Sequence, residues 1–127
     1  MTNSENIQNL KPLEEYAQFH KALAEPVRLR ILGLLSIEES LCVCEFMDVL
    51  DLSQSTVSRH LAYLKNQGIV VSWREGTWMH YAVDKNHPAF DVLQTSLSFL
   101  SELEQSKEDR SGLKGFESIT KQCHPKT

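Results

Sequence analysis

Two cysteines separated by one residue are the side chains of this sequence best suited to specific chemistry. Cys42 and Cys44 stand at the start of a short helix that the apolar pattern predicts over residues 41–50. A helix N-terminus lowers the pKa of a thiol and so favours the thiolate that a metal requires. Thiolates are soft ligands that select arsenic(III), cadmium, lead, copper(I) or zinc over magnesium or calcium. The pair predicts a soft-ion site, and its alternative is two small apolar core residues.

The spacing of the pair also predicts a consequence of ion capture. In a regular helix, residues two apart point about 200° away from each other. One ion can bind both sulfurs only if the backbone at Cys42 and Cys44 is non-helical or becomes distorted. We therefore expect capture to unwind or tilt this helix, and with it the helix predicted over residues 54–66 that follows directly.

A third cysteine, Cys123, lies in a polar C-terminal segment that we expect to be loosely ordered. It is a candidate third sulfur ligand, since a tail reaches far, including across a dimer, but loses entropy on closure. Its alternatives are an exposed thiol without a role and an accessory metal pair with His124. A disulfide or persulfide-type bridge to Cys42 or Cys44 is also open, because neighbours one residue apart rarely bridge each other.

The composition is that of an ordinary globular protein. The chain has 127 residues, of which 41% are hydrophobic and 24% charged, and a net charge of −4 at pH 7. It contains no apolar run of the roughly eighteen residues that a membrane span needs. The N-terminal residues do not resemble a secretory signal, and an odd number of cysteines argues against a disulfide framework. We expect one cytoplasmic domain that does not associate with membranes.

The apolar pattern predicts a mainly helical fold with one β-hairpin. Predicted helices cover residues 10–24, 26–35, 41–50, 54–66 and 88–104, and predicted strands cover residues 69–74 and 77–83. Glu75-Gly76 is the expected connection, which places Trp73 opposite Trp78. This order is that of a winged helix-turn-helix. We expect a flexible N-terminus over residues 1–9, a DNA-binding and dimerisation domain over residues 10–105, and a flexible tail over residues 106–127.

The helix over residues 54–66 carries the features of a DNA-reading element. Ser53 is a favourable N-cap, and Val57, Leu61 and Leu64 form an apolar stripe. The opposite face is polar and small enough for the major groove. Residues 53–85 hold four basic and two acidic side chains, so this region is locally positive. The candidate DNA contacts are Gln54, Ser55, Ser58, Arg59 and, at the tip of the hairpin, Arg74. The alternative is a solvated amphipathic helix beside a hairpin.

Three stretches carry a resemblance to a known family. ALAEPVRLRILGLL, LCVCEFMDVLDLSQSTVSRHLAYLKNQGIV and REGTWMHYAV together resemble the ArsR/SmtB metal-sensing repressors over about residues 19–88. The resemblance implies a homodimer joined through the first and last helices, bound to a two-fold symmetric DNA operator. Within it, LCVCE resembles the inducer segment of the arsenic-responsive and cadmium/lead-responsive members. His60 matches the S-x-H-L position, and we interpret it as structural.

The sequence departs from the family at two metal positions. Arsenic sensors of the C-V-C-x-x-C type have a third cysteine where this chain has Met47, which we interpret as a core filler. Zinc-sensing members bind zinc between their last helices through Asp-x-His and His-x-x-Glu. Counted from Asp84, the corresponding residues here are Asn86, Leu97 and Leu100, so we do not expect a zinc sensor of that type.

The sequence as a whole predicts a repressor that leaves its operator when arsenite, or a related trivalent arsenic or antimony compound, binds the cysteine thiolates. The expected metal ligands are Cys42, Cys44 and Cys123, with arsenite as inducer and no permanent cofactor. The alternative within the same fold is a sensor of cadmium or lead, or of thiol oxidation or persulfide through the same cysteines. An alternative from another functional class is a metal-binding buffer without operator specificity. The polar face of the helix over residues 54–66 argues against it. An enzyme is not expected, because no nucleophile elbow, phosphate loop or paired carboxylates stand out.

Overall fold

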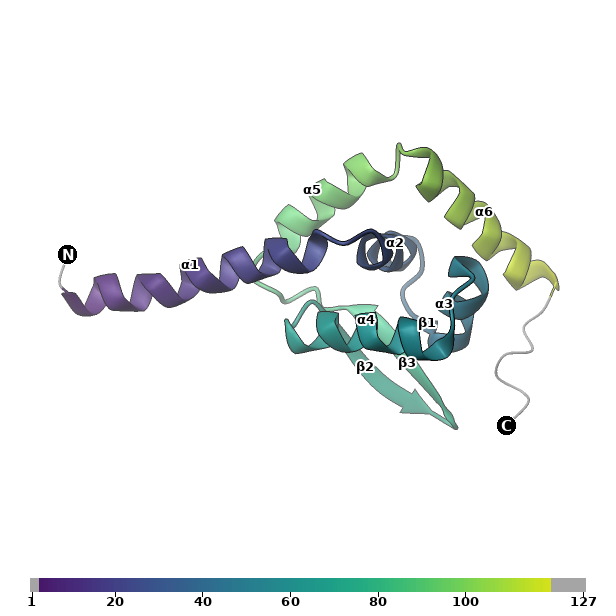
Figure 1. Cartoon of the computed structure of the whole chain (residues 1–127), viewed down its shortest axis with the longest axis horizontal. Helices are drawn as coiled ribbons and strands as arrows, with labels where there is room; N and C mark the ends of the chain where they lie inside the picture. Colours follow the sequence, from purple (N-terminus) through teal and green to yellow (C-terminus); the bar gives the residue numbers. More distant parts are fainter. Residues whose placement is uncertain (1–2, 120–127) are drawn as a thin grey trace.

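The computed structural model describes residues 3–119, and it has the order of a winged helix-turn-helix (Figure 1). The predicted fold class is confirmed. The elements are α1 (Asn3–Leu23), α2 (Pro26–Leu35), β1 (Leu41–Cys42), α3 (Val43–Leu50), α4 (Gln54–Asn66), β2 (Val70–Glu75), β3 (Trp78–Val83), α5 (Phe90–Leu100) and α6 (Glu104–Ile119). In Figure 1, α1 extends well beyond the body of the molecule, and α5 and α6 lie around α2. None of the described helices is long and apolar enough to cross a membrane.

The starts of α2 and α4 follow from their capping residues. Glu25 is extended at the N-cap of α2, where its carboxylate accepts a hydrogen bond from the backbone N–H of Arg28 at 2.9 Å. Pro26 fills the first helical position, which needs no N–H donor. Ser53 caps α4 in the same way, accepting from the N–H of Thr56 at 3.2 Å. Both predicted helix starts are confirmed.

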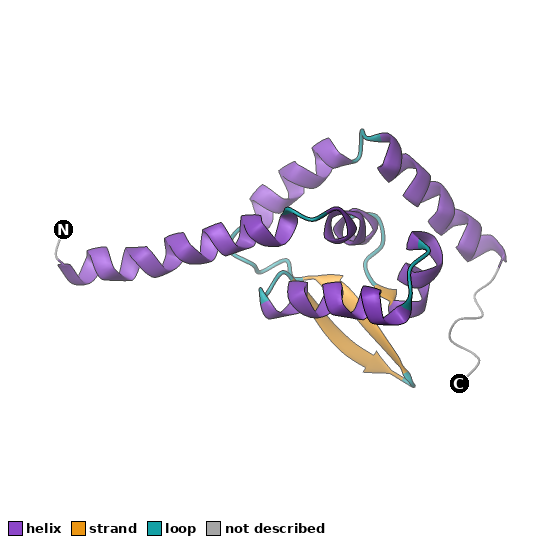
Figure 2. Ribbon diagram, in the orientation of Figure 1, coloured by secondary structure: helices purple, strands orange, loops and turns teal. Residues whose placement is uncertain are grey.

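The sheet has three antiparallel strands in the order β1-β3-β2 (Figure 2). Two expectations about it were wrong. The two-residue loop is Gly76-Thr77, so Glu75 pairs with Trp78 and Trp73 pairs with His80. Gly76 has a φ of 64°, which suits the first central position of a tight hairpin turn. Residues 41–42 are also extended rather than helical, because they pair with β3.

The core is apolar and lies between the helices and the inner face of the sheet. The stripe predicted for α4, Val57, Leu61 and Leu64, is fully buried. Phe46 of α3 and Leu93 of α5 are also fully buried. Their burial fixes the direction in which α3 and α4 present their polar faces, since an amphipathic helix can turn only one face to the core.

The C-terminal part differs from the expected single helix and loose tail. Helix α5 ends at Leu100. A second helix, α6, begins at Glu104 and packs against both α2 and α3. Leu113 and Asp109 of α6 are almost fully buried. A polar segment is helical here because these two side chains dock it on the core. At the other end, α1 begins at Asn3, within the segment expected to be flexible.

Candidate nucleic-acid interface and thiol site

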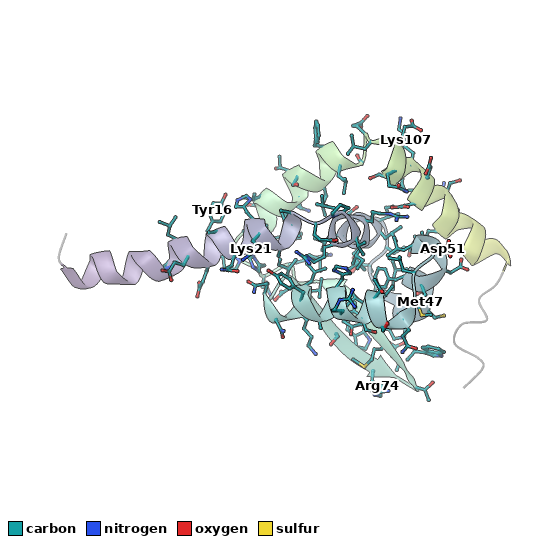
Figure 3. The ribbon with its side chains drawn as sticks, in the orientation of Figure 1. Tyr16, Lys21, Met47, Asp51, Arg74 and Lys107 are labelled. Carbon is teal, nitrogen blue, oxygen red and sulfur yellow. The ribbon has the colours of Figure 1, made fainter. Side chains whose placement is uncertain are left out.

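The connection between α3 and α4 sets the position of the reading helix. Asp51 ends α3 in the left-handed region, with φ 58°, and its N–H donates to the carbonyl oxygen of Met47 at 2.9 Å. Asp51, Leu52 and Ser53 therefore turn the chain sharply into α4. Figure 3 labels Met47 and Asp51 on α3, beside the start of α4. This helix, three-residue turn and second helix have the spacing of a helix-turn-helix.

The exposed face of α4 holds the predicted base-reading side chains. Gln54, Ser55 and Arg59 are exposed, and Ser58 is half-buried at the edge of the face. Ser55 and Arg59 lie on the face opposite the buried stripe, whereas Gln54 is exposed because it is the first residue of the helix. An exposed Arg and Gln can each make paired hydrogen bonds to base edges, and short Ser side chains allow close approach. The types and exposure of these side chains are those that the predicted contact with the major groove requires.

Arg74 lies near the tip of the β2–β3 hairpin (Figure 3). It is exposed, and its Nη1 donates to the carbonyl oxygen of Thr77 at 3.3 Å. This bond leaves other guanidinium donors for a ligand, since Arg carries five N–H groups. The hairpin extends from the same side of the molecule as α4 (Figure 2).

A cluster under the reading helix was missed from the sequence. Arg28 of α2 places its guanidinium 4.1 Å from the ring centre of Tyr63, and its Nε donates to the carbonyl oxygen of Ala22 at 2.7 Å. Its Nη1 also lies 3.4 Å from His60 Nδ1. Burial lowers the pKa of His60, and the positive charges of Arg28 and Arg59 add to this effect. Arg28 thus connects α2 with the core side of α4.

Cys42 is completely buried. It ends β1 and is the extended N-cap of α3, where its backbone N–H donates to Glu45 Oε1 at 2.7 Å. Burial raises the pKa of its thiol from 9.0 to about 11. The expected lowering by the helix N-terminus was therefore wrong, because loss of water opposes ionisation more strongly. The extended backbone meets the condition, set above, that Cys42 and Cys44 do not share regular helical geometry.

Cys44 lies in the first turn of α3, is half-buried and is in the disulfide form. Met47 is half-buried and packs against the core, as expected for a filler. Residues 3–119 contain no cluster of three His, Cys, Asp or Glu side chains that could hold a metal ion. Cys123 and His124 lie outside the described residues. Among the described residues, Cys42 and Cys44 are thus the two cysteines of the site.

The zinc positions tested on the sequence remain unsuitable. Leu97 is buried, and Leu100 packs against the core. Asp84 instead organises a turn, where its Oδ1 accepts from the N–H of Asn86 at 2.9 Å. Apolar side chains at these positions offer no ligand for zinc.

Comparison with known proteins gives the same family. Residues 25–72 match the family described as bacterial regulatory protein, arsR family. Over 76 residues the chain is 45% identical to an uncharacterised HTH-type transcriptional regulator of Methanocaldococcus jannaschii, covering 59% of this chain and 85% of that protein. The chain belongs to the ArsR family. It is therefore related to transcriptional regulators rather than to enzymes, and the family binds DNA operators as homodimers.

Relatives of this ArsR-family protein carry different inducer names. It is 42% identical over 73 residues to the arsenical resistance operon repressor of Escherichia coli, and 38% identical over 73 residues to a CadC homologue of Staphylococcus aureus, a cadmium resistance regulator. These matches cover 58% of this chain in both cases, and 62% and 60% of the two relatives. The chain thus spans about 60% of their length.

Solved structures show the same fold. The repressor BigR of Xylella fastidiosa superposes with a TM-score of 0.63 at 25% identity, over 80% of this chain and 98% of that chain. The antimony-specific repressor AntR superposes with a TM-score of 0.58 at 29% identity, over 72% of this chain and 81% of that chain.

Proposed function

We propose that this protein represses transcription by binding a two-fold symmetric operator, and that arsenite releases it. The observation that carries the proposal is the position of Cys42 and Cys44 at the start of α3, which packs directly on the reading helix α4. The arsenical resistance repressor of E. coli and the antimony-specific AntR support an inducer of this chemical class.

Capture of an ion by both sulfurs requires local rearrangement. Cys42 is completely buried, and its N–H is held by Glu45 of α3. To share an ion with Cys44, its sulfur must leave its buried position, and the first turn of α3 must change with it. An ion that binds this rearranged state better than the DNA-bound state lowers operator affinity by the difference between its two binding free energies.

The chemistry of arsenite suits a buried, neutral thiol. In the reduced protein, in which Cys44 is also a thiol, arsenite reacts as As(OH)₃, and two S–As bonds form while two As–O bonds break. Each thiol proton leaves with a hydroxyl group as water, and neither arsenic nor sulfur changes oxidation state. A divalent ion such as cadmium must instead expel each thiol proton into solution. A neutral thiol such as that of Cys42 can therefore react with arsenite without releasing a proton into solution.

The proposed dimer uses the exposed apolar side chains of α1, α5 and the turn after α5. Leu13 and Tyr16 are exposed on α1, and Val92 and Phe99 are exposed on α5. Phe99 is 72% exposed, and Leu103 beyond it is 45% exposed. A second copy that covers these side chains gives two α4 helices related by a two-fold axis, and hence a two-fold symmetric operator.

Thiol oxidation is the second candidate signal. Cys44 is in the disulfide form, and a structure described as reduced HlyU of Vibrio cholerae superposes with a TM-score of 0.62 at 29% identity. We propose Cys123 as the partner in such a bridge, and also as the third sulfur ligand in the arsenite mechanism. Titration of thiols with and without oxidant separates the two signals.

The deciding experiment is fluorescence anisotropy of the reduced protein on the DNA upstream of its own gene, titrated with arsenite. Wild type is expected to dissociate, and Cys42→Ser and Cys44→Ser to stay bound. Met47→Leu keeps the packing without the sulfur, so it should respond as wild type does. The Cys123→Ser curve shows whether the tail thiol belongs to the site. Normal release from Cys44→Ser refutes capture by the pair, and release by oxidant or cadmium alone reassigns the inducer.

A further inference from the structure

One row of side chains crosses the sheet from Cys42 to the wing. Cys42 of β1 pairs with His80 of β3, and His80 pairs with Trp73 of β2. Residues directly opposite each other in antiparallel strands project from the same face. The next row, Leu41, Tyr81 and Ser72, therefore lies on the other face, where Leu41 and Tyr81 pack with the core. Cys42, His80 and Trp73 are therefore neighbours on the opposite face of the sheet from that row.

His80 is the middle of this row and is tied to the wing by its side chain. Its ring stacks on Trp73, with ring centres 6.0 Å apart and an interplanar angle of 16°. Its Nε2 lies 3.4 Å from Glu75 Oε1, and Glu75 Oε2 accepts a hydrogen bond from Trp73 Nε1 at 3.0 Å. Three wing residues thus form a closed set of contacts. Although Trp73 and Glu75 are exposed, His80 itself is buried.

We propose that His80 is a positioning residue that couples Cys42 to the wing, so that ion capture at Cys42 displaces the DNA contact made by Arg74. This inference rests on the proposed function. Arg74 lies between Trp73 and Glu75 on β2, which are the two residues that His80 contacts. When Cys42 leaves its place in β1, His80 loses its neighbour on one side. The stack on Trp73 and the contact with Glu75 then shift, and the strand that carries Arg74 shifts with them.

This route is separate from the route through α3 and α4. Helix α3 acts on the reading helix directly, whereas the row across the sheet acts on the hairpin that follows it. An inducer that uses both routes reduces base contacts and wing contacts together. Because coupling through a row of packed residues needs direct evidence, the test measures coupling itself rather than stability.

The test uses reduced full-length protein with Trp78→Phe, in which Trp73 is the only tryptophan left. Trp78 Nε1 has no hydrogen-bond partner among the described residues, so Phe is a mild replacement there. Sodium arsenite is titrated by calorimetry without DNA, by Trp73 emission, and by operator anisotropy. The variant is His80→Gln. The matched control is Val71→Ala, because Val71 is on the same face of the sheet but outside the row.

In the parent and in Val71→Ala, arsenite should change Trp73 emission and weaken operator binding. His80→Gln should take up arsenite with an affinity within about threefold of the parent, but its loss of operator affinity should be at least about tenfold smaller. The Trp73 response should disappear in the same variant. A full arsenite response in His80→Gln overturns the proposal, as does constant Trp73 emission in a parent that releases its operator.

Two further results keep the outcomes distinct. If calorimetry shows no arsenite uptake by the parent, the proposed function fails, and this inference fails with it. If uptake and release are normal and only the His80 effect is missing, the inference alone fails. Should His80→Gln not fold, Glu75→Ala removes the exposed partner of the ring and should reduce the Trp73 response. An undiminished response in Glu75→Ala counts against the coupling.

Discussion

Arg30 and Asp109 form a two-pronged ion pair between α2 and α6, although 79 residues separate them in the sequence. Arg30 Nε donates to Oδ2 at 3.0 Å, and Nη2 donates to Oδ1 at 2.9 Å. Asp109 is 5% exposed, and its hydrogen bonds raise the pKa of Arg30. Paired bonds of this kind fix direction as well as distance. The pair therefore holds α6 in one orientation on the core.

Replacing Asp109 should test this attachment. Asp109→Asn should lower the free energy of unfolding by about 1–3 kcal/mol, because it leaves the Arg30 charge without its partner. The lower part of that range is expected, since the Arg30 side chain is 25% exposed and water screens its charge. Urea denaturation measures the loss. Glu39→Gln, which breaks the exposed pair with Lys85, should change stability by less than about 0.5 kcal/mol.

Helix α6 could not be predicted from the sequence, because a residue far away in the chain attaches it to the core. Periodicity finds helices by their apolar stripe, and α6 has one buried leucine, Leu113, in a polar segment with two glycines. Its attachment depends on Arg30, which the chain order places far away. By contrast, α2 and α4 were predictable because Pro26 and Ser53 mark their starts locally and a regular apolar face follows. The predicted register of the β2–β3 hairpin was wrong by one residue, because Gly76 fits either central position of a two-residue turn.

Gly112 offers a second test of where α6 lies. An alanine Cβ built at this position would be 3.5 Å from Val49 Cγ1, which is ordinary contact. Gly112→Ala should therefore raise the free energy of unfolding by about 0.5–1 kcal/mol through helix propensity. Gly112→Leu should lower it, because the larger side chain has no room against α3. Thermal melting compares the two variants, and equal stabilisation by both would show that α6 does not pack on α3.

We predict different effects on DNA binding for the replacement of Arg59 and of Arg74. Arg59→Ala should weaken binding to the operator by about 1–3 kcal/mol and relax sequence preference, as expected for a base contact. Arg74→Ala should weaken binding to all sequences alike and reduce the salt dependence by about one phosphate contact. Anisotropy at several salt concentrations measures both effects. Lys114→Ala, an exposed charge on α6, is the control and should alter neither.

The environment of His60 predicts an acid-dependent loss of stability. Burial lowers the pKa of His60 below its ordinary value of 6.5, so the folded protein disfavours the charged ring. The resulting stability is present in full above pH 6.5 and is lost as the pH falls through 6.5 toward the folded value. The slope is at most about 1.4 kcal/mol per pH unit for one proton. His60→Gln should flatten it in urea titrations, and the exposed His20→Gln should not.

The thiol site shows what spacing can and cannot establish. Cys42 and Cys44 were identified as a pair from their separation alone, and the break in helical geometry between them was foreseen as a requirement. The burial of Cys42 was given only as the alternative, and it depends on the pairing of Leu41–Cys42 with β3. A two-residue strand leaves no periodicity in the sequence, so its partner residues, including His80, become visible only in the fold.

The exposed apolar side chains of α1 and α5 link the stability of the protein to its concentration. Leu13 and Tyr16 of α1, like Phe99 of α5, are apolar side chains that a lone chain leaves in water. If a second chain covers them, every dimer that forms removes this exposed surface, and its melting temperature rises with the amount of protein present. Scarce regulator would then be less stable as well as less abundant. Repression would fall off more steeply than in proportion to the number of molecules, which sets a threshold of expression below which the operator stays open.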